Sequence, residues 1–497
     1  MRQDGNAVDW FLDRHLREGR GDRVAFSDPR RMLTYGDLAC ESARFAGALS
    51  KVGIGRERRI ALIMLDTVDF PIAFWGALRA GVVPVPINTL LTAETTEYIL
   101  RDSRADAVVV SEALAGSLPR IPGIPIIASL AEFLALGSEN TPTVEASADE
   151  VAFWLYSSGS TGAPKGVRHV HGSLQFTAET YGRQVLGIRP DDVMFSAAKA
   201  FHAYGLGNCM TFPMSVGASS VFLPDRPTPD AVLDTMRRHR PTLFGGVPTL
   251  YAGLLANPSI GPGAGSDRLR RCISAGEALP ADIGHRWKSM VGLDILDGIG
   301  STEMLHIFIS NRPDDIRYGT SGKPVPGYEA AVLDEHGHPV PNGEAGELVI
   351  RGASAADGYW NQRAKTRKTF QGEWTHTGDT YIRDTDGYYR YQGRSDEMLK
   401  VSGIWVSPFE VEEALISHPS VLEAAVVGHE DRDGLTKPKA FVILRDTNAD
   451  RDALAEALKS HVKDRIGVWK YPRWIEFSDS LPKTATGKIQ RFRLRDK

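Results

Sequence analysis

Ser157-Ser158-Gly159-Ser160-Thr161-Gly162-Ala163-Pro164-Lys165-Gly166 is the most informative segment of this 497-residue chain. It brings glycines, hydroxyl side chains and one lysine close together. Glycine lets a ligand approach the backbone closely and accepts positive φ angles. Backbone N–H groups, hydroxyls and a lysine bind anionic oxygens. The segment therefore has the chemistry of a triphosphate site.

The spacing of this segment excludes the commonest nucleotide-binding loop, which requires G-x-x-x-x-G-K-[ST]. Here the lysine follows Pro164 and precedes Gly166. Gly/Ser-rich stretches are most often flexible linkers, and composition alone leaves that alternative open. Two observations argue against a linker: the segment is short and contains proline and lysine, and it follows the apolar residues 151–156, which are typical of a buried strand. Composition alone leaves phosphate binding and a linker about equally open.

Length and composition indicate a cytoplasmic enzyme of at least two domains, because 497 residues exceed one compact core. A formal net charge of −4 gives no reason to expect nucleic-acid binding. Cys40, Cys209 and Cys272 have no metal-binding spacing and predict no disulfide framework. The N-terminal residues lack the apolar stretch of a signal peptide, and proline and glycine interrupt the apolar windows, so no membrane span is expected.

Helical and strand patterns alternate through the first part of the chain. A helix over 35–52 is expected to begin at Thr34, because Asp37 follows three residues later. A second helix is expected at 68–80. Strands are expected at 59–64, 82–86, 107–110, 219–223, 243–247, 271–274 and 294–296. This alternation predicts mostly parallel sheets covered by helices.

The pattern changes after about residue 318, where closely spaced Gly, Pro and Asp-Gly turns predict a small antiparallel barrel or curved sheet. Beyond Asp396, a strand-helix-strand pattern over 405–444 and a helix over 453–465 predict a small α+β unit. The predicted fold is α/β. A large N-terminal domain, residues 1–395, contains two mostly parallel α/β sheet subdomains plus a small β-barrel at about 320–395, and a C-terminal α+β domain follows at 396–497.

Four further motifs lie far from the glycine-rich segment. They are Ser274-Ala-Gly-Glu-Ala-Leu-Pro280, Asp297-Gly-Ile-Gly-Ser-Thr-Glu303, Trp374-Thr-His-Thr-Gly-Asp379 and Leu481-Pro-Lys-Thr-Ala-Thr-Gly-Lys488. Taken singly, each has an ordinary alternative: a strand-helix turn, a helix cap, a capped turn or a solvated tail. Their order along one chain is what makes them informative.

In content and order, the five motifs resemble the adenylate-forming superfamily of acyl-CoA synthetases, peptide-synthetase adenylation domains and luciferases. The resemblance extends from about Thr34 to Lys488, and residues 201–208 and 297–311 are most similar to the benzoate-CoA ligase branch. It implies that a carboxylate attacks the α-phosphate of ATP to give acyl-AMP and pyrophosphate, after which a thiol, usually of CoA, displaces AMP. It also implies a mobile C-terminal lid domain that rotates between the two half-reactions.

The resemblance assigns roles to the motif residues. Glu303 would help to hold Mg²⁺, Thr302 would contact the α-phosphate, and Lys488 would reach the acyl carboxylate and the α-phosphate. The β- and γ-phosphates would lie against Ser157, Ser158, Gly159, Ser160, Thr161, Gly162 and Lys165. The adenine would be bordered by Ala275, Gly276 and Glu277, with Gly298 to Ser301 beneath it, and the ribose would be held by Asp379 and Arg394. Asp396 would be the hinge, and Lys400 to Gly403 would line the pantetheine tunnel.

The acyl pocket implied by the resemblance is built from small, flat or apolar residues, which suit an aryl ring better than a long chain. They are His202, Ala203, Tyr204 and Gly205, with Ile299, Gly300, His306 and Ile307 opposite. His202 would gate the pocket in response to the thiol or would simply be a packed histidine. His306 would meet a ring substituent or a water. These segments contain no acid to pair with an amine, which argues against amino-acid substrates.

The preferred hypothesis is an ATP-dependent aryl-CoA ligase that converts benzoate or a substituted benzoate to its CoA thioester, AMP and pyrophosphate. An aryl-acid adenylating enzyme that loads an acyl carrier protein is the alternative. A regulatory relative without catalysis is disfavoured because Lys488, Glu303 and Asp379 are intact. The expected ligands are an aromatic carboxylic acid, ATP, Mg²⁺ and coenzyme A. No nucleic acid or membrane partner is expected, and a homodimer is left open.

Overall fold

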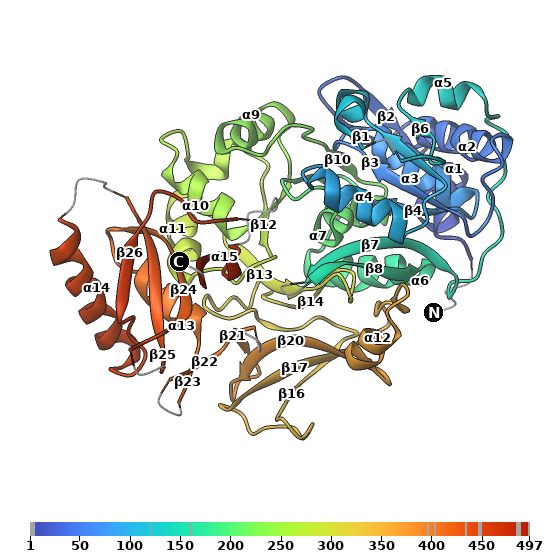
Figure 1. Ribbon diagram of the computed structural model, residues 1–497. Coiled ribbons are helices and arrows are strands. Elements are labelled where there is room, and N and C mark those ends of the chain that lie inside the picture. Colours follow the sequence, from blue (N-terminus) through green and yellow to red (C-terminus); the bar gives the residue numbers. More distant parts are fainter. Residues whose placement is uncertain are drawn as a thin grey trace.

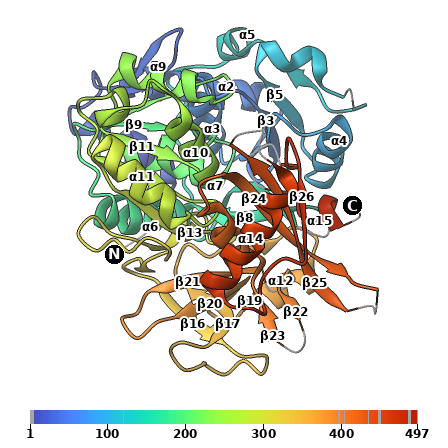
Figure 2. The ribbon, with the colours of Figure 1, turned by 90° about the vertical axis from the view of Figure 1, so that its left-hand side faces the viewer.

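The computed structural model describes residues 5–119, 121–159, 162–394, 397–401, 404–432, 435–445, 450–483 and 489–495. Two α/β sheets and a curled antiparallel sheet form a large N-terminal body, and a small α+β unit follows it (Figure 1). In Figure 2 this C-terminal unit, in orange and red, faces the viewer. The predicted α/β class and the order of its parts are confirmed. Within the described ranges, no helix is long and apolar enough to cross a membrane.

The larger sheet has nine strands in the order β15-β14-β13-β12-β11-β9-β10-β1-β2. The six strands from β13 to β1 run parallel, and the outer strands are antiparallel. Helices α9 (Pro229–His239), α10 (Pro248–Ala256) and α11 (Ala281–Val291) cover one face. The strands are β1 (Val24–Ser27), β2 (Met32–Thr34), β9 (Val193–Ser196), β10 (Ser219–Val221), β11 (Leu243–Gly246), β12 (Arg271–Ser274), β13 (Ile295–Gly300), β14 (Ile307–Ser310) and β15 (Lys323–Pro324).

The second sheet is parallel and has the order β4-β3-β5-β6. Thr34 and Asp37 form the expected capping box at the start of its covering helix α2. The strands are β3 (Arg59–Ile63), β4 (Val83–Pro86), β5 (Ala107–Val110) and β6 (Ile126–Ile127), and the helices are α2 (Tyr35–Lys51), α3 (Asp69–Arg79), α4 (Ala93–Asp102) and α5 (Leu130–Ala135). The helices and strands expected for both sheets are confirmed, with ends that shift by a few residues.

The glycine-rich segment lies in a β-hairpin. Strand β7 (Val151–Gly159) is the expected buried strand, and it pairs with β8 (Gly162–Val170), which in turn pairs with β18 (Gly358–Tyr359). The sequence pattern does not predict β8, because the glycines and proline of this segment are typical of a turn. The middle of the hairpin is anchored by Trp360, whose backbone N–H donates to Gly166 O (2.8 Å) and whose Nε1 donates to Asp102 O (2.8 Å).

The antiparallel part of the N-terminal body is a five-stranded sheet. Strand β17 pairs along one edge of the long strand β20, while β19 and β21 pair with the two ends of its other edge, so the sheet curls into a half-barrel. Helix α12 lies next to it (Figure 1). The elements are β16 (Glu329–Leu333), β17 (Ala345–Arg351), α12 (Arg363–Thr369), β19 (Phe370–Gln371), β20 (Trp374–Arg383) and β21 (Tyr389–Arg394).

The C-terminal unit has its own apolar core, to which α13, α14 and the sheet β24-β25-β26 contribute. Phe409 of α13 contacts Tyr391 of β21 at a ring-centroid distance of 5.2 Å, which joins this unit to the half-barrel. The elements are β22 (Leu399–Val401), β23 (Ile404–Val406), α13 (Pro408–Ile416), β24 (Val421–Glu430), β25 (Thr436–Leu444), α14 (Arg451–Ile466), β26 (Trp474–Phe477) and α15 (Phe492–Arg495).

Short helical segments complete the N-terminal body. The one that matters for the site is α7 (Ala203–Leu206), which continues into η4 (Gly207–Thr211) and α8 (Phe212–Met214). The others are η1 (Asp9–Asp13), α1 (Arg14–Arg17), η2 (Glu112–Ser117), α6 (His171–Thr177), η3 (Ala178–Val185) and η5 (Pro262–Gly265).

Candidate active site

The hairpin β7–β8 and the turn after β13 bring a cation and a carboxylate together. Lys165 Nζ lies 3.9 Å from Glu303 Oε1, and Ser157 Oγ donates to the same oxygen at 3.4 Å. Both charged side chains are mostly buried, with exposed fractions of 19% and 17%. Three residues predicted to handle the triphosphate and its metal are thus neighbours, although Ser157 and Glu303 are separated by 146 positions.

Tyr359 completes this cluster, and the sequence analysis did not single it out. Its hydroxyl donates to Glu303 Oε1 at 2.8 Å, and Lys165 Nζ donates to that hydroxyl at 3.4 Å. The ammonium also lies 4.4 Å from the centroid of the tyrosine ring, within cation–π range. Burial and the Glu303 carboxylate raise the pKa of Tyr359, so the phenol stays protonated and donates. We call Ser157, Lys165, Glu303 and Tyr359 the phosphate corner.

Burial lowers the pKa of Lys165, while the Glu303 carboxylate raises it and Lys365 and Arg394 lower it further. An anionic ligand beside this lysine would offset the cost of its burial, since a nearby opposite charge favours the ammonium form. Phosphate oxygens in this corner would therefore stabilise the buried Lys165 ammonium.

The turn that carries Thr302 and Glu303 is held from two sides. His169 Nε2 donates to Thr302 O at 2.9 Å, and Ala356 N donates to Glu303 O at 2.8 Å. Ser301 Oγ accepts from Met304 N at 3.2 Å. The segment leads through this turn into β14, so the alternative of a helix cap at Glu303 does not hold.

Two glycines keep strand β13 flat against β14. A Cβ at Gly298 would lie 2.8 Å from Ile309 O, and one at Gly300 would lie 2.5 Å from His306 O. Contacts this close leave no room for a side chain, so glycine is required at both positions. The two glycines therefore allow β14 to pair closely with β13, and the adenine floor at residues 298–301 stays a prediction.

Asp379 and Arg394 lie opposite each other on β20 and β21. Arg394 Nη1 donates to Asp379 Oδ1 at 3.3 Å and to Thr377 O at 3.2 Å. The preceding Gly378 lies within β20, has a φ of 69° and packs against the guanidinium, so this strand position favours glycine. The structure thus brings together the two residues predicted to hold a ribose, and Arg394 is also close enough to Lys165 to lower its pKa.

Residues 275–277 follow β12 and precede α11, next to β13. Ala275 is buried, and Gly276 has a φ of 97°. Asp297, which the sequence analysis did not assign, is 3% exposed and accepts from Leu279 N at 3.4 Å, while burial raises its pKa to about 8. Its Oδ1 has no hydrogen-bond partner among the described residues. It lines a small cavity with Ala278, Leu279, Gly319, Thr320, Ser321, Tyr391 and Phe409.

The predicted acyl-pocket residues meet at the carboxyl ends of the parallel strands. Tyr204 OH donates to Gly246 O (3.1 Å) and Ile273 O (3.2 Å), and His306 Nε2 donates to Tyr204 O at 3.2 Å. Burial lowers the pKa of His306 to about 3, so this imidazole is neutral at physiological pH. His202 caps α7, and Ala203, Gly205, Ile299, Gly300 and Ile307 lie on the same segments.

Several predicted residues lie outside the described part of the chain. They are Ser160, Thr161, Asp396, Gly403 and Lys488. For Ser158, Gly159, Gly162 and Lys400, the structure describes the strand assignment but not the surroundings of the residue. Residues on either side of Lys488 are described: Lys483 and Ile489 form an antiparallel bridge, and Arg491 pairs with Glu412 at 2.7 Å.

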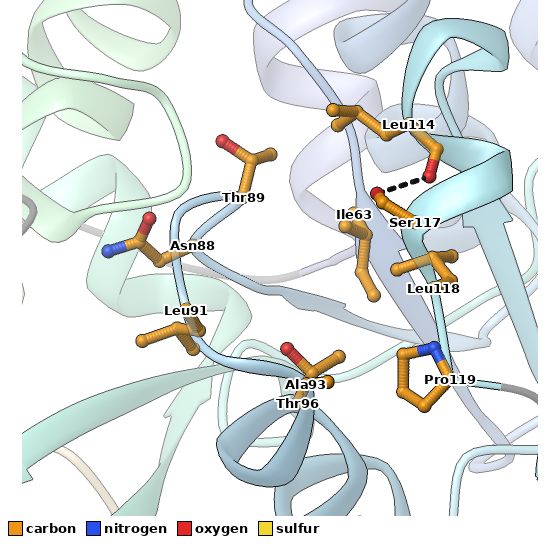
Figure 3. Close-up of a pocket in the computed structure, with 10 residues that line it drawn as sticks. All are labelled: Ile63, Asn88, Thr89, Leu91, Ala93, Thr96, Leu114, Ser117, Leu118 and Pro119. Atoms are coloured by element: carbon orange, nitrogen blue, oxygen red, sulfur yellow. Dashed lines mark hydrogen bonds between the residues drawn. The ribbon is translucent and has the colours of Figure 1, made fainter.

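Figure 3 shows a separate pocket at the carboxyl ends of β3 and β4. Its lining consists of Ile63, Asn88, Thr89, Leu91, Ala93, Thr96, Leu114, Ser117, Leu118 and Pro119. None of these side chains is charged, so this pocket offers no counter-charge for a phosphate or a carboxylate. The candidate site is the phosphate corner with the segments around it.

A magnesium ion suits the phosphate corner. Mg²⁺ is usually bound by one or two carboxylates together with substrate phosphates and waters, without an all-protein cage. Glu303 supplies one such carboxylate beside Lys165 and Ser157. Among the described residues, no group of three or more His, Cys, Asp or Glu side chains could hold a metal ion.

Two family models match this chain. Residues 12–360 match the family model described as AMP-binding enzyme, and residues 410–488 match the one described as AMP-binding enzyme C-terminal domain. The chain is 53% identical to a 4-hydroxybenzoate--CoA/benzoate--CoA ligase of Rhodopseudomonas palustris, covering 99% of this chain and 94% of that protein. It is 54% identical to a benzoate--CoA ligase of Thauera aromatica, covering 99% and 95%.

A solved structure gives the same result. The chain is similar to a benzoate CoA ligase from Burkholderia xenovorans with a TM-score of 0.93 and 50% sequence identity, covering 99% of each chain. The similarity therefore extends over both the N-terminal body and the C-terminal unit.

Proposed function

The chain belongs to the AMP-binding enzyme family, and from this premise we propose that it acts as an ATP-dependent aryl-CoA ligase. It joins benzoate or a substituted benzoate to coenzyme A, and AMP and pyrophosphate are released. The main structural support for this function is the phosphate corner, where Lys165 and Glu303 lie 3.9 Å apart. The predicted acyl segments, residues 202–205 and the pocket residues 299, 300, 306 and 307, contain no acidic side chain.

The chemical problem is that two anions, the aryl carboxylate and the triphosphate, must come into contact. Lys165 and Ser157 hold the β- and γ-phosphates of the leaving pyrophosphate, and preorganised charge of this kind stabilises the transition state without reorganisation. Glu303 would hold Mg²⁺, which when bound neutralises phosphate charge. Thr302 contacts the α-phosphate, and Lys488 neutralises the charge that develops between the carboxylate and the α-phosphate.

The nucleotide is oriented by the two neighbouring motifs. Asp379 accepts from the ribose hydroxyls and Arg394 holds the aspartate in place at 3.3 Å. The adenine lies between residues 275–277 and the flat backbone of Gly298 to Ser301. Asp297 faces the same region, and because burial raises its pKa to about 8 it is mainly protonated at neutral pH.

The second half-reaction needs a different arrangement of the C-terminal unit. Rotation about Asp396 withdraws Lys488 and brings Lys400 to Gly403 to the pantetheine channel, since a hinge requires only one or two residues to absorb the torsion change. The thiol then attacks the acyl carbon of the adenylate and AMP leaves. The same channel would accept the phosphopantetheine of a carrier protein. The identity of the acceptor as CoA is therefore a separate part of the proposal.

An aromatic ring fits the acyl segment because its side chains are flat or small and uncharged. The Tyr204 hydroxyl is hydrogen-bonded to two backbone carbonyls and His306 is neutral, so neither side chain competes electrostatically for the substrate carboxylate.

The proposal includes a reducing cytoplasmic compartment, with which the free thiols of Cys40, Cys209 and Cys272 agree.

The test is a panel of benzoate, hydroxybenzoates, cyclohexanecarboxylate and a medium-chain fatty acid, scored for AMP release with and without CoA. Benzoate-dependent AMP release that requires CoA supports the proposal. Activity restricted to fatty acids would refute the aryl substrate, and turnover with a carrier protein alone would refute CoA as the acceptor. Absence of acid-dependent pyrophosphate exchange with every acid would refute catalysis itself.

A further inference from the structure

A buried carboxylate lies below the acyl segment and has no part in the proposed chemistry. Asp66 follows β3 and is 2% exposed. Its Oδ1 accepts from Ala200 N at 3.2 Å, and its Oδ2 lies 4.0 Å from Lys199 Nζ. Burial raises the pKa of Asp66 to about 6, against the opposing effect of Lys199, so the group is ionised at mildly alkaline pH.

Lys199 connects this carboxylate to the other sheet. Its ammonium donates to Leu223 O, to Asp225 O at 2.8 Å and to Pro224 O at 3.5 Å. These carbonyls follow β10 of the nine-stranded sheet, whereas Asp66 follows β3 of the four-stranded sheet. A single side chain therefore ties the carboxyl ends of strands from the two α/β sheets together. A charge buried in this way is retained only where it is paired and hydrogen-bonded.

The backbone of Lys199 in turn sets the acyl segment. His202 N donates to Lys199 O at 3.1 Å, which closes the turn before α7. A Cβ at Gly205 would lie 1.9 Å from Lys199 O, so α7 packs directly on that carbonyl. A shift of Lys199 must therefore move His202 and Gly205, because closely packed backbone leaves no free space to absorb the displacement.

We propose that Asp66 and Lys199 are positioning residues that fix the floor of the aryl pocket by holding the turn before α7 between the two sheets. This inference rests on the proposed aryl-CoA ligase function. Neither side chain touches the reacting atoms. Their effect is on the fit of the aromatic acid, whereas the phosphate corner, built from the hairpin and the turn after β13, is independent of them.

The test uses the full-length enzyme at about pH 8, where Asp66 is ionised, and measures KM for benzoate and for MgATP by pyrophosphate exchange. Asp66→Asn presents an amide to the Lys199 ammonium, and Lys199→Met removes the donors to three carbonyls. We expect each variant to raise KM for benzoate about tenfold, the equivalent of one charge-assisted hydrogen bond. KM for MgATP should stay within about twofold.

Asp192→Asn is the matched control. Like Asp66, Asp192 is a buried aspartate, and it accepts from Arg270 Nε (2.9 Å) and Thr242 Oγ1 (2.7 Å). It directly precedes β9, at the end of that strand away from the acyl segment. It should lower the melting temperature without changing KM for benzoate. Lys199→Gln, which retains a donor, should recover part of the affinity and replaces the methionine variant if that one does not fold.

The outcomes separate the two proposals. Loss of benzoate activity in the wild-type enzyme would refute the aryl-CoA ligase function. Wild-type activity together with an unchanged KM for benzoate in the Asp66 and Lys199 variants would refute the positioning role. Equal increases in both KM values, or an equal effect of Asp192→Asn, would also refute it, because that is the signature of general destabilisation.

Discussion

Removal of one hydroxyl from the phosphate corner should weaken nucleotide binding selectively. Tyr359→Phe deletes the donor that lies 2.8 Å from Glu303 Oε1 but keeps the ring 4.4 Å from Lys165 Nζ. The remaining contacts of that carboxylate oxygen, Ser157 at 3.4 Å and Lys165 at 3.9 Å, are long, so the Glu303 carboxylate can turn toward Lys165. A glutamate turned in this way is less well placed for Mg²⁺.

The size of the effect follows from the hydrogen bond. A bond to a charged group contributes about 1.5–3 kcal/mol. Part of this free energy is lost by the free enzyme and by the MgATP complex alike, and that part does not change binding. We therefore expect the binding free energy of MgATP to weaken by about 1–2 kcal/mol, which corresponds to a KM roughly 5- to 30-fold higher. KM for the aromatic acid should change less than about twofold, because Tyr359 contacts no residue of the acyl segment in the described structure.

Pyrophosphate exchange gives both KM values, and calorimetric titration with MgATP gives a binding constant that does not depend on turnover. Tyr389→Phe is the matched control, because this tyrosine of the half-barrel is buried as well and its hydroxyl donates to Ala330 O at 3.0 Å. Both variants should lose similar stability, while only Tyr359→Phe loses nucleotide affinity. Equal MgATP affinity in Tyr359→Phe and the wild type would refute the assigned role.

Three further variants test other parts of the molecule. Lys488→Ala should cripple adenylation far more than thioester formation from preformed aryl-AMP, and equal loss in both steps, measured in separate single-turnover assays, would contradict the domain rotation. Burial raises the pKa of Asp297 to about 8, so the native state holds a proton that the unfolded chain has lost above about pH 4. Stability should then fall as pH rises, by up to about 1.4 kcal/mol per unit, and urea denaturation between about pH 5 and 8 should show that Asp297→Asn lacks this slope. Arg491→Met leaves the buried Glu412 carboxylate without its cation and should destabilise the C-terminal unit by about 3–5 kcal/mol in denaturation experiments, whereas an unchanged midpoint would show that the pair contributes nothing.

Local patterns predicted the regular elements well, because each depends on residues close in sequence. The Thr34–Asp37 capping box and the strand at 107–110 are examples. Strand β8 was not predicted, since its glycines and Pro164 disfavour a strand and only pairing with β7 and β18 on both edges stabilises it. Tertiary pairing outweighs intrinsic propensity there.

From the sequence alone came the order of the motifs and the prediction that Lys165, Glu303, Asp379, Arg394 and Lys488 carry the chemistry. Gly298 and Gly300 suggested a ligand floor from the sequence, and only the structure shows that the backbone of His306 and Ile309 occupies the space that side chains at these positions would need. Tyr359, Asp297 and the Asp66–Lys199 pair became visible only in the tertiary structure. The reason is physical: the role of each depends on a partner at least 18 positions away and on burial that the whole fold creates. A tyrosine or aspartate has no special chemistry until folding removes its water and supplies its neighbour.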